Sequence, residues 1–147
     1  MKSTRILIVI AAMLMILPSV MSAETVTLRI ADQFPLKHFA SKTGTQAFMK
    51  RVEKMSGGQI KFKHYPAGQL AKAAGMLNAV KNGVADIAMT GVVYVSDKMP
   101  LSGAVMLPGL YNEVAKGTTA YGKLAKNELY EAEFLRHGVR PLWVSLA

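Results

Sequence analysis

The sequence predicts an α/β domain in which a mostly parallel sheet is flanked by helices. Two stretches carry this prediction. Residues 57–86 read as a strand, a proline–glycine turn, a helix and a second strand in close succession. Residues 25–55 read as an earlier strand followed by an amphipathic helix. Strands joined through a helix run parallel and connect by a right-handed crossover, so we expect both stretches to share one sheet.

The first element is a removable one. Basic Lys2 and Arg5 precede an apolar run at 6–17, and small residues follow at Ser22 and Ala23. This order predicts a secretory signal peptide over residues 1–23, cleaved after Ser22 or Ala23. As a helix the run 6–17 would reach about 18 Å, short of the ~30 Å hydrocarbon core of a bilayer. A cleaved signal is therefore favoured over a membrane anchor.

The remaining residues, 24–147, are predicted to form one exported domain. Residues 26–31 alternate apolar and polar side chains, as in a half-buried strand. The helix that follows is predicted to be amphipathic, with basic residues on one face. Its predicted apolar face consists of Phe39, Ala47, Phe48, Val52 and Met55.

The second unit begins at Gly57 and Gly58, which can close the preceding helix in the left-handed conformation. Residues 59–64 alternate as a strand, and the turn at 65–68 contains proline and glycine. A helical pattern from residue 70 stops at Gly83, and the apolar stretch 84–89 is predicted to be a buried strand.

The last third is patterned less sharply. Residues 98–103 and 107–109 read as loops, and residues 113–136 read as one helix. Its predicted core face consists of Val114, Tyr121, Leu124, Leu129 and Phe134. Gly138 is expected to end that helix and residues 139–146 to form a strand. A domain ending on a strand is expected to be incomplete.

Ligands of open α/β sheets bind beyond the carboxyl ends of the strands, where loops lead into helices. Three segments meet that condition: residues 32–38, 65–69 and 90–94. We call them the rim loops, and they are the candidate binding site.

Several motifs in the right order carry a family resemblance. The letters YPAGQL, then a helix ending LNAVKNG, then ADIAM resemble the extracytoplasmic solute-binding proteins of TRAP transporters, the DctP-type family. Pro35 and His38 upstream, and Tyr94, Pro100 and the Leu-Pro pair at 107–108 downstream, are similar to the same pattern. The resemblance covers residues 25–144.

The resemblance implies a type II-like periplasmic-binding-protein lobe and no enzymatic activity or cofactor. It implies a protein that captures a small, dicarboxylate-like organic acid in the periplasm and delivers it to TRAP membrane permease subunits. The ligand-facing positions that it implies are Gln33, Phe34, His38, Thr90, Gly91 and Tyr94. Two bland readings stay open: His38 as loop structure, and Tyr94 as a surface aromatic packed on its own domain.

Three departures from the family pattern stand beside the resemblance. Residues 71–75 replace a glycine and charged pair, and Gly109 stands where a bulky aromatic is usual. The arginines that clamp the ligand carboxylate in this family would lie beyond Ala147, and Arg140 does not match them. We therefore expect a truncated chain, with the second lobe missing, that binds solutes weakly or not at all.

Composition narrows the class further. The chain of 147 residues has a formal charge of +9 and no cysteine, which excludes disulfides, thiolate metal sites and cysteine nucleophiles. A run of basic residues falls on predicted solvent faces without interleaved aromatics, so solubility rather than nucleic-acid binding is expected. These residues are Lys50, Arg51, Lys54, Lys61 and Lys63.

Catalytic and metal sites are not predicted. His38, His64 and His137 are isolated, without metal-ligand spacing, and His64 fits a satisfied histidine at the edge of the core. No nucleophile elbow, P-loop or dinucleotide fingerprint occurs. The remaining acidic cluster is predicted to be a solvated helix face: Glu128, Glu131 and Glu133.

Alternatives from other classes stay open. The same lobe could serve a non-transport periplasmic binding or sensor module, or the chain could be a non-functional remnant. A secreted hydrolase with an unrecognised site is a more distant alternative.

Overall fold

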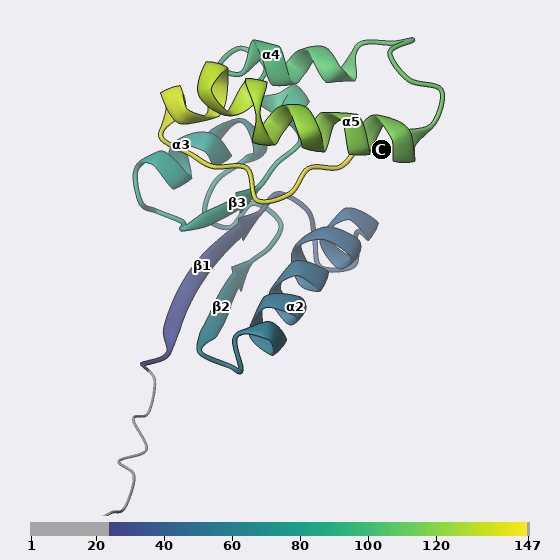
Figure 1. Cartoon of the computed structure of the whole chain (residues 1–147). Helices are drawn as coiled ribbons and strands as arrows, with labels where there is room; N and C mark the ends of the chain where they lie inside the picture. The colour runs from purple at the N-terminus through teal and green to yellow at the C-terminus, as the bar shows by residue number, and fades with distance from the viewer. Residues whose placement is uncertain (1–23, 147) are drawn as a thin grey trace, which may run out of the picture.

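The computed structural model describes residues 24–146, and the predicted signal peptide lies outside them. Three parallel strands form one sheet in the order β2-β1-β3 (Figure 1). They are β1 (Val26–Asp32), β2 (Ile60–Tyr65) and β3 (Ile87–Met89). The predicted α/β class with a parallel sheet is confirmed. Within residues 24–146 no helix combines the length and the apolar character needed to cross a membrane.

The third strand is shorter than predicted. The backbone N–H groups of Val84 and Ala85 both donate to the carbonyl of Ala79, so these residues close the preceding helix instead of joining the sheet. Val84 is 44% exposed. The prediction of a buried strand from residue 84 is therefore wrong for its first half.

The first helical region lies beside β2. A π-helical turn, Ser41–Gln46, runs into α2 (Ala47–Met55). The ring of Phe48 packs against Phe62 of β2, with centroids 5.8 Å apart. The predicted apolar face is only partly correct, because Phe39 and Met55, at the two ends of the region, are exposed.

The second crossover helix follows the turn at 65–68. A 3-10 turn at Ala73–Gly75 leads into α3 (Met76–Lys81), and the chain leaves the helix through Gly83 at φ +67°. Met76 is fully buried against Ala31 of β1. The predicted strand–turn–helix–strand order is confirmed.

The last third contains more helix than predicted. Residues 98–103 are not a loop throughout, because α4 (Pro100–Gly103) and a 3-10 turn at Ala104–Met106 occupy this part of the chain. Proline at the first position of α4 favours a helix start, since its missing N–H would be unpaired there anyway. The helix α5 (Val114–Lys126) is capped at Asn127, and the chain continues into a π-helical turn at Tyr130–Phe134.

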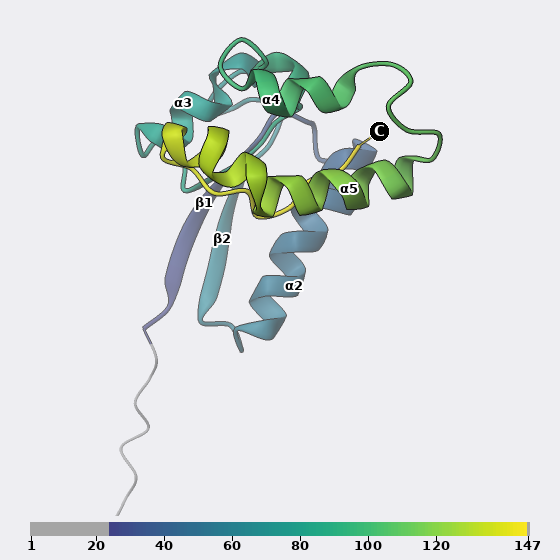
Figure 2. The same ribbon diagram turned by 45° about the horizontal axis from the view of Figure 1, so that its top comes forward.

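The main core lies between these helices. Tyr121 and Phe134 are buried in it, as predicted, whereas Val114 and Leu124 are 47% and 40% exposed. Both views show α3, α4 and α5 gathered at the carboxyl ends of the strands and α2 beside β2 (Figure 2). The two exposed residues lie on α5 together with the buried Tyr121, so the predicted core face is only partly buried even before the helix ends.

Glu133 is another correction. Its side chain lies in the core, 3% exposed, and its two oxygens accept from the backbone N–H groups of Leu101 and Ser102 at 2.7 and 2.8 Å. The carboxylate therefore caps the start of α4. The prediction of a solvated face is wrong for this glutamate, whereas Glu128 and Glu131 are exposed.

The predicted strand at 139–146 is also wrong. This segment is extended but joins no strand within residues 24–146. Its groups bind helices instead: the N–H of Leu146 donates to Oγ1 of Thr118 at 3.1 Å, and Trp143 stacks on Phe48 at 4.5 Å. An apolar segment alone cannot supply the neighbouring strand that a β-ladder needs.

An ion pair ties β1 to the residue before β3. Nη2 of Arg29 lies 2.9 Å from Oδ1 of Asp86, and hydrogen bonds from the Arg29 side chain and backbone hold the pKa of the Asp86 carboxyl below its usual range. A carboxyl with a lowered pKa contributes stability above its unfolded pKa and loses it as the pH falls through the folded value. Both side chains are partly exposed, so this contribution is small.

We expect Asp86→Asn to lower the free energy of unfolding by less than about 1 kcal/mol at neutral pH. The difference between the two proteins, measured at neutral pH and again at an acidic pH below the folded pKa of Asp86, should shrink at the acidic pH, because the carboxyl of the parent protein is then also protonated. Chemical denaturation at both pH values measures this. An equal difference at both would show that the charge of Asp86 contributes nothing.

Candidate functional site

The three rim loops meet at the carboxyl edge of the sheet. The N–H of Ala67 donates to the carbonyl of Phe34 at 2.9 Å, and that of Gly68 donates to the carbonyl of Asp32 at 3.0 Å. The N–H of Gln33 is 3.3 Å from the carbonyl of Met89, at the end of β3. The backbone therefore joins loops that are far apart in the sequence.

One group of candidate residues gathers around the Gln33 side chain. Its Oε1 accepts from the N–H of Gly91 at 3.1 Å and lies 2.9 Å from the hydroxyl of Thr90. That hydroxyl is also 3.1 Å from the carbonyl of Ala73 and 3.5 Å from that of Gly91, so three acceptors compete for its single proton. Within residues 24–146 the Nε2 amide of Gln33 donates to no other group. It is a donor that a solute could use.

Tyr94 lies next to this group. A Cβ built on Gly91 would be 3.3 Å from the Tyr94 ring and 3.6 Å from Nε2 of Gln33, so the absent side chain of Gly91 leaves a small space between ring and amide. Tyr94 is 51% exposed, which keeps its hydroxyl accessible. The structure thus brings Gln33, Thr90, Gly91 and Tyr94 together.

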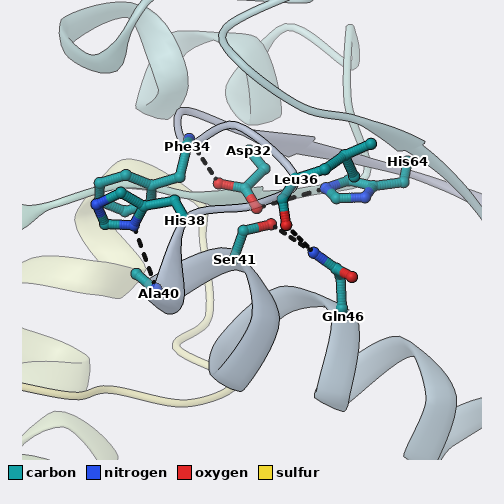
Figure 3. Close-up of polar contacts among 8 residues, drawn as sticks. All are labelled: Asp32, Phe34, Leu36, His38, Ala40, Ser41, Gln46 and His64. Atoms are coloured by element: carbon teal, nitrogen blue, oxygen red, sulfur yellow. Dashed lines mark hydrogen bonds and ion pairs between the residues drawn. The ribbon is translucent and has the colours of Figure 1, made fainter.

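Phe34 and His38 form a second group on the other side of the first loop. Their rings stack with centroids 4.3 Å apart and an angle of 9° between the planes. Nδ1 of His38 accepts from the N–H of Ala40 at 3.2 Å (Figure 3). In the neutral ring this bond leaves the proton on Nε2. His38 is therefore partly loop structure, with one ring nitrogen still available as a donor.

The sequence pattern assigned no role to Asp32 and gave His64 only a place at the edge of the core. In the structure Nε2 of His64 lies 3.4 Å from Oδ2 of Asp32, and the two side chains are 13% and 0% exposed (Figure 3). Strand parity contains the signal for this pair. Asp32 continues the inward positions of Leu28 and Ile30, as His64 continues those of Ile60 and Phe62.

Neither metal nor pocket geometry points to another site at this edge. In the described part of the chain no three His, Cys, Asp or Glu side chains are grouped to hold a metal ion. A groove of about 470 Å³ lies along α5 and is lined mainly by apolar side chains such as Tyr111, Tyr121 and Leu146. None of the residues that line it belongs to the rim loops, where polar groups of three loops converge, so we place the candidate site at the rim.

Gly91 offers a direct test of this packing. Its backbone, at φ −73° and ψ 131°, suits alanine, so we expect Gly91→Ala to change the free energy of unfolding by less than about 0.5 kcal/mol. The new methyl should displace the exposed Tyr94 ring, because their separation is tighter than usual contact. Thermal unfolding and the ring NMR signals of Tyr94 measure the two effects. An unmoved ring would contradict the packing described here.

Comparisons with known proteins agree on one family. Residues 35–145 match the family described as "Bacterial extracellular solute-binding protein, family 7". A solute-binding protein of Albidiferax ferrireducens is 31% identical over 93 residues, which are 60% of this chain and 27% of that protein.

Solved structures of TRAP periplasmic solute-binding proteins are similar as well. One from Desulfovibrio salexigens, an open complex with the C-terminus of a symmetry mate in its ligand-binding site, is 26% identical with a TM-score of 0.67. The match covers 76% of this chain and 34% of that protein. One from Rhodoferax ferrireducens, with copurified benzoate, is 27% identical with a TM-score of 0.64. There the match covers 70% of this chain and 32% of that protein. The chain thus spans about a third of the length of these relatives.

Proposed function

The chain belongs to the bacterial extracellular solute-binding proteins of family 7, and from that premise we propose that it captures a small organic acid in the periplasm for a TRAP-type membrane permease. The carrying observation is the convergence of Gln33, Thr90, Gly91 and Tyr94 where the rim loops meet. Nothing in this role requires catalysis, a cofactor or contact with nucleic acid.

The donors of the rim favour an anionic solute. Three groups can each donate to a carboxylate oxygen: the free Nε2 amide of Gln33, the Nε2–H of His38 and the hydroxyl of Tyr94. Hydrogen bonds to charged groups are the stronger ones. The stacked rings of Phe34 and His38 add an apolar wall. A few placed donors beside apolar surface are typical of small-molecule sites.

The class of acid is the finer part of the proposal. The resemblance implies a dicarboxylate-like solute, whereas the Rhodoferax ferrireducens relative holds benzoate, an aromatic monocarboxylate. The common chemistry is one carboxylate held by donors. We propose this as the recognised feature, with succinate and benzoate as the two probes that separate the classes.

Residues 24–146 supply one face of the proposed site. Solute-binding lobes close because the ligand contacts both of them, and this chain spans about a third of its solved relatives. We therefore propose that the rim alone binds an acid with a dissociation constant of millimolar order, about −4 kcal/mol.

NMR titration of the chain with succinate and with benzoate tests the proposal. We expect amide shifts confined to the rim loops 32–38, 65–69 and 90–94. Gln33→Ala should weaken the binding about fivefold, since it removes a donor worth about 1 kcal/mol in a solvated site. Gln59→Ala, an exposed position just before β2 and therefore at the end of the sheet opposite the rim loops, is the matched control and should leave the affinity unchanged. Shifts centred on the α5 groove, or an affinity of micromolar order, would contradict the proposed half-site.

A further inference from the structure

Asp32 and His64 make a buried pair where the first rim loop begins (Figure 3). Their facing atoms, Oδ2 and Nε2, lie 3.4 Å apart, and neither atom has a hydrogen-bond partner within residues 24–146. A carboxylate that is shut away from water is costly unless a donor or a cation compensates it. The imidazole of His64 is the group placed to compensate the carboxylate of Asp32.

The other oxygen of Asp32 shapes the loop. Oδ1 accepts from the backbone N–H of Phe34 at 2.8 Å, a side-chain-to-backbone bond two residues ahead that turns the chain as it leaves β1. Gln33, at the centre of this turn, reaches Thr90, while Phe34 stacks on His38. The orientation of one carboxylate therefore decides where both ligand-facing side chains lie.

A second side chain holds the far end of the same loop. Nε2 of Gln46, in the π-helical turn, donates to the carbonyl of Leu36 at 2.7 Å and lies 3.3 Å from the hydroxyl of the buried Ser41 (Figure 3). The loop 32–38 is thus fixed by side chains at both ends, and Asp32 is the anchor at the sheet.

We propose that Asp32 and His64 are positioning residues that hold the first rim loop in its ligand-facing shape before any solute arrives. The inference rests on the proposed function for the ligand-facing role of Gln33 and Phe34. A loop that is ordered in advance loses less conformational freedom on binding. His64 acts through Asp32: it keeps the buried carboxylate compensated, and the carboxylate keeps Phe34 in place.

Hydrogen exchange of the Phe34 amide measures this directly and needs no solute. The amides of the β1–β2 ladder report global opening of the same molecule. We expect Asp32→Ala, which removes the acceptor, to speed exchange at Phe34 at least tenfold relative to those ladder amides. Asp32→Asn keeps an acceptor oxygen and should stay within about threefold of the parent protein.

Coupling between the two residues is tested by a double variant. His64→Leu leaves the carboxylate without its partner and should also speed Phe34 exchange at least tenfold. The Asp32→Asn/His64→Leu protein buries no charge at this place, and an amide costs much less to bury than an unpaired carboxylate, so the exchange should return to within about threefold of the parent protein. Asp86→Asn, at the residue before β3 and outside the loop, is the control and should leave Phe34 unchanged.

Three results would overturn the inference. Unchanged exchange in Asp32→Ala would mean that the carboxylate does not hold the turn. A double variant no better than His64→Leu would mean that the two residues are uncoupled. Phe34 and ladder amides accelerating together would assign the pair to global stability alone. Because no solute is present, each outcome is independent of whether the chain binds an organic acid.

Discussion

Replacing Glu133 with alanine should lower the free energy of unfolding by about 3 kcal/mol and the melting temperature by roughly 10 °C. The carboxylate accepts from two backbone N–H groups at the start of α4. Of the two donors, Ser102 is fully buried and Leu101 is half exposed. Water can accept from the N–H of Leu101 when the carboxylate is removed. Most of the loss therefore comes from the buried N–H of Ser102, which is left without an acceptor, and from the cavity left in the core.

Urea denaturation of Glu133→Ala measures this loss, and Glu131→Ala provides the matched control. Glu131 is two residues away in the same helical turn but exposed, so its replacement should change the free energy of unfolding by less than about 0.5 kcal/mol. Similar losses in both variants would mean that the helical turn, and not the cap on α4, depends on these glutamates.

Glu133 also shows where the sequence pattern stops being informative. It lies in a polar stretch with Glu128 and Glu131, and local periodicity gives the three residues no different status. What separates Glu133 is a long-range partner, the start of α4, which lies some thirty residues earlier in the chain. Such a capping bond depends on how α4 and the later helical turn pack, which no local pattern encodes.

The strand–helix units of the first half were predictable because their signals are local. Alternation marks β1 and β2. Gly57, Gly68 and Gly83 mark the turns, because each has a positive φ angle that residues with a Cβ rarely adopt. The segment 139–146 is also rich in apolar residues, yet it is not a strand. The difference is the partner: β1 finds β2 and β3 on its two sides, whereas this segment finds only helices.

The location of the candidate site could be predicted from the sequence, but the side-chain pair that supports its first loop could not. Parallel strands put the loops after them at one edge, which is enough to bring Gln33 to Thr90 and Gly91. The pairing of Asp32 with His64 needs the register in which Ile30 faces His64 across β1 and β2. Register follows from tertiary pairing, so neither Asp32 nor His64 could be assigned a partner from its local sequence.

Two glycines of α5 should respond to alanine in opposite directions. A Cβ on Gly117 would lie 2.7 Å from Cγ of Tyr111 and 2.9 Å from Cδ1 of Leu146, distances that force both side chains to move. A Cβ on Gly122 would meet only Cγ2 of Val144 at 3.6 Å, an ordinary contact. Alanine gains about 1 kcal/mol over glycine inside a helix in either position.

We therefore expect Gly117→Ala to lower the free energy of unfolding by about 2 kcal/mol, because overpacking of up to ~3 kcal/mol outweighs the helical gain. Gly122→Ala should raise it by about 0.5–1 kcal/mol, since the gain there meets no clash. Urea denaturation of the two variants compares them within one helix. Stabilisation by both would mean that the Tyr111 ring yields into the α5 groove at no cost. That result would contradict the tight packing of Tyr111 and Leu146 against Gly117.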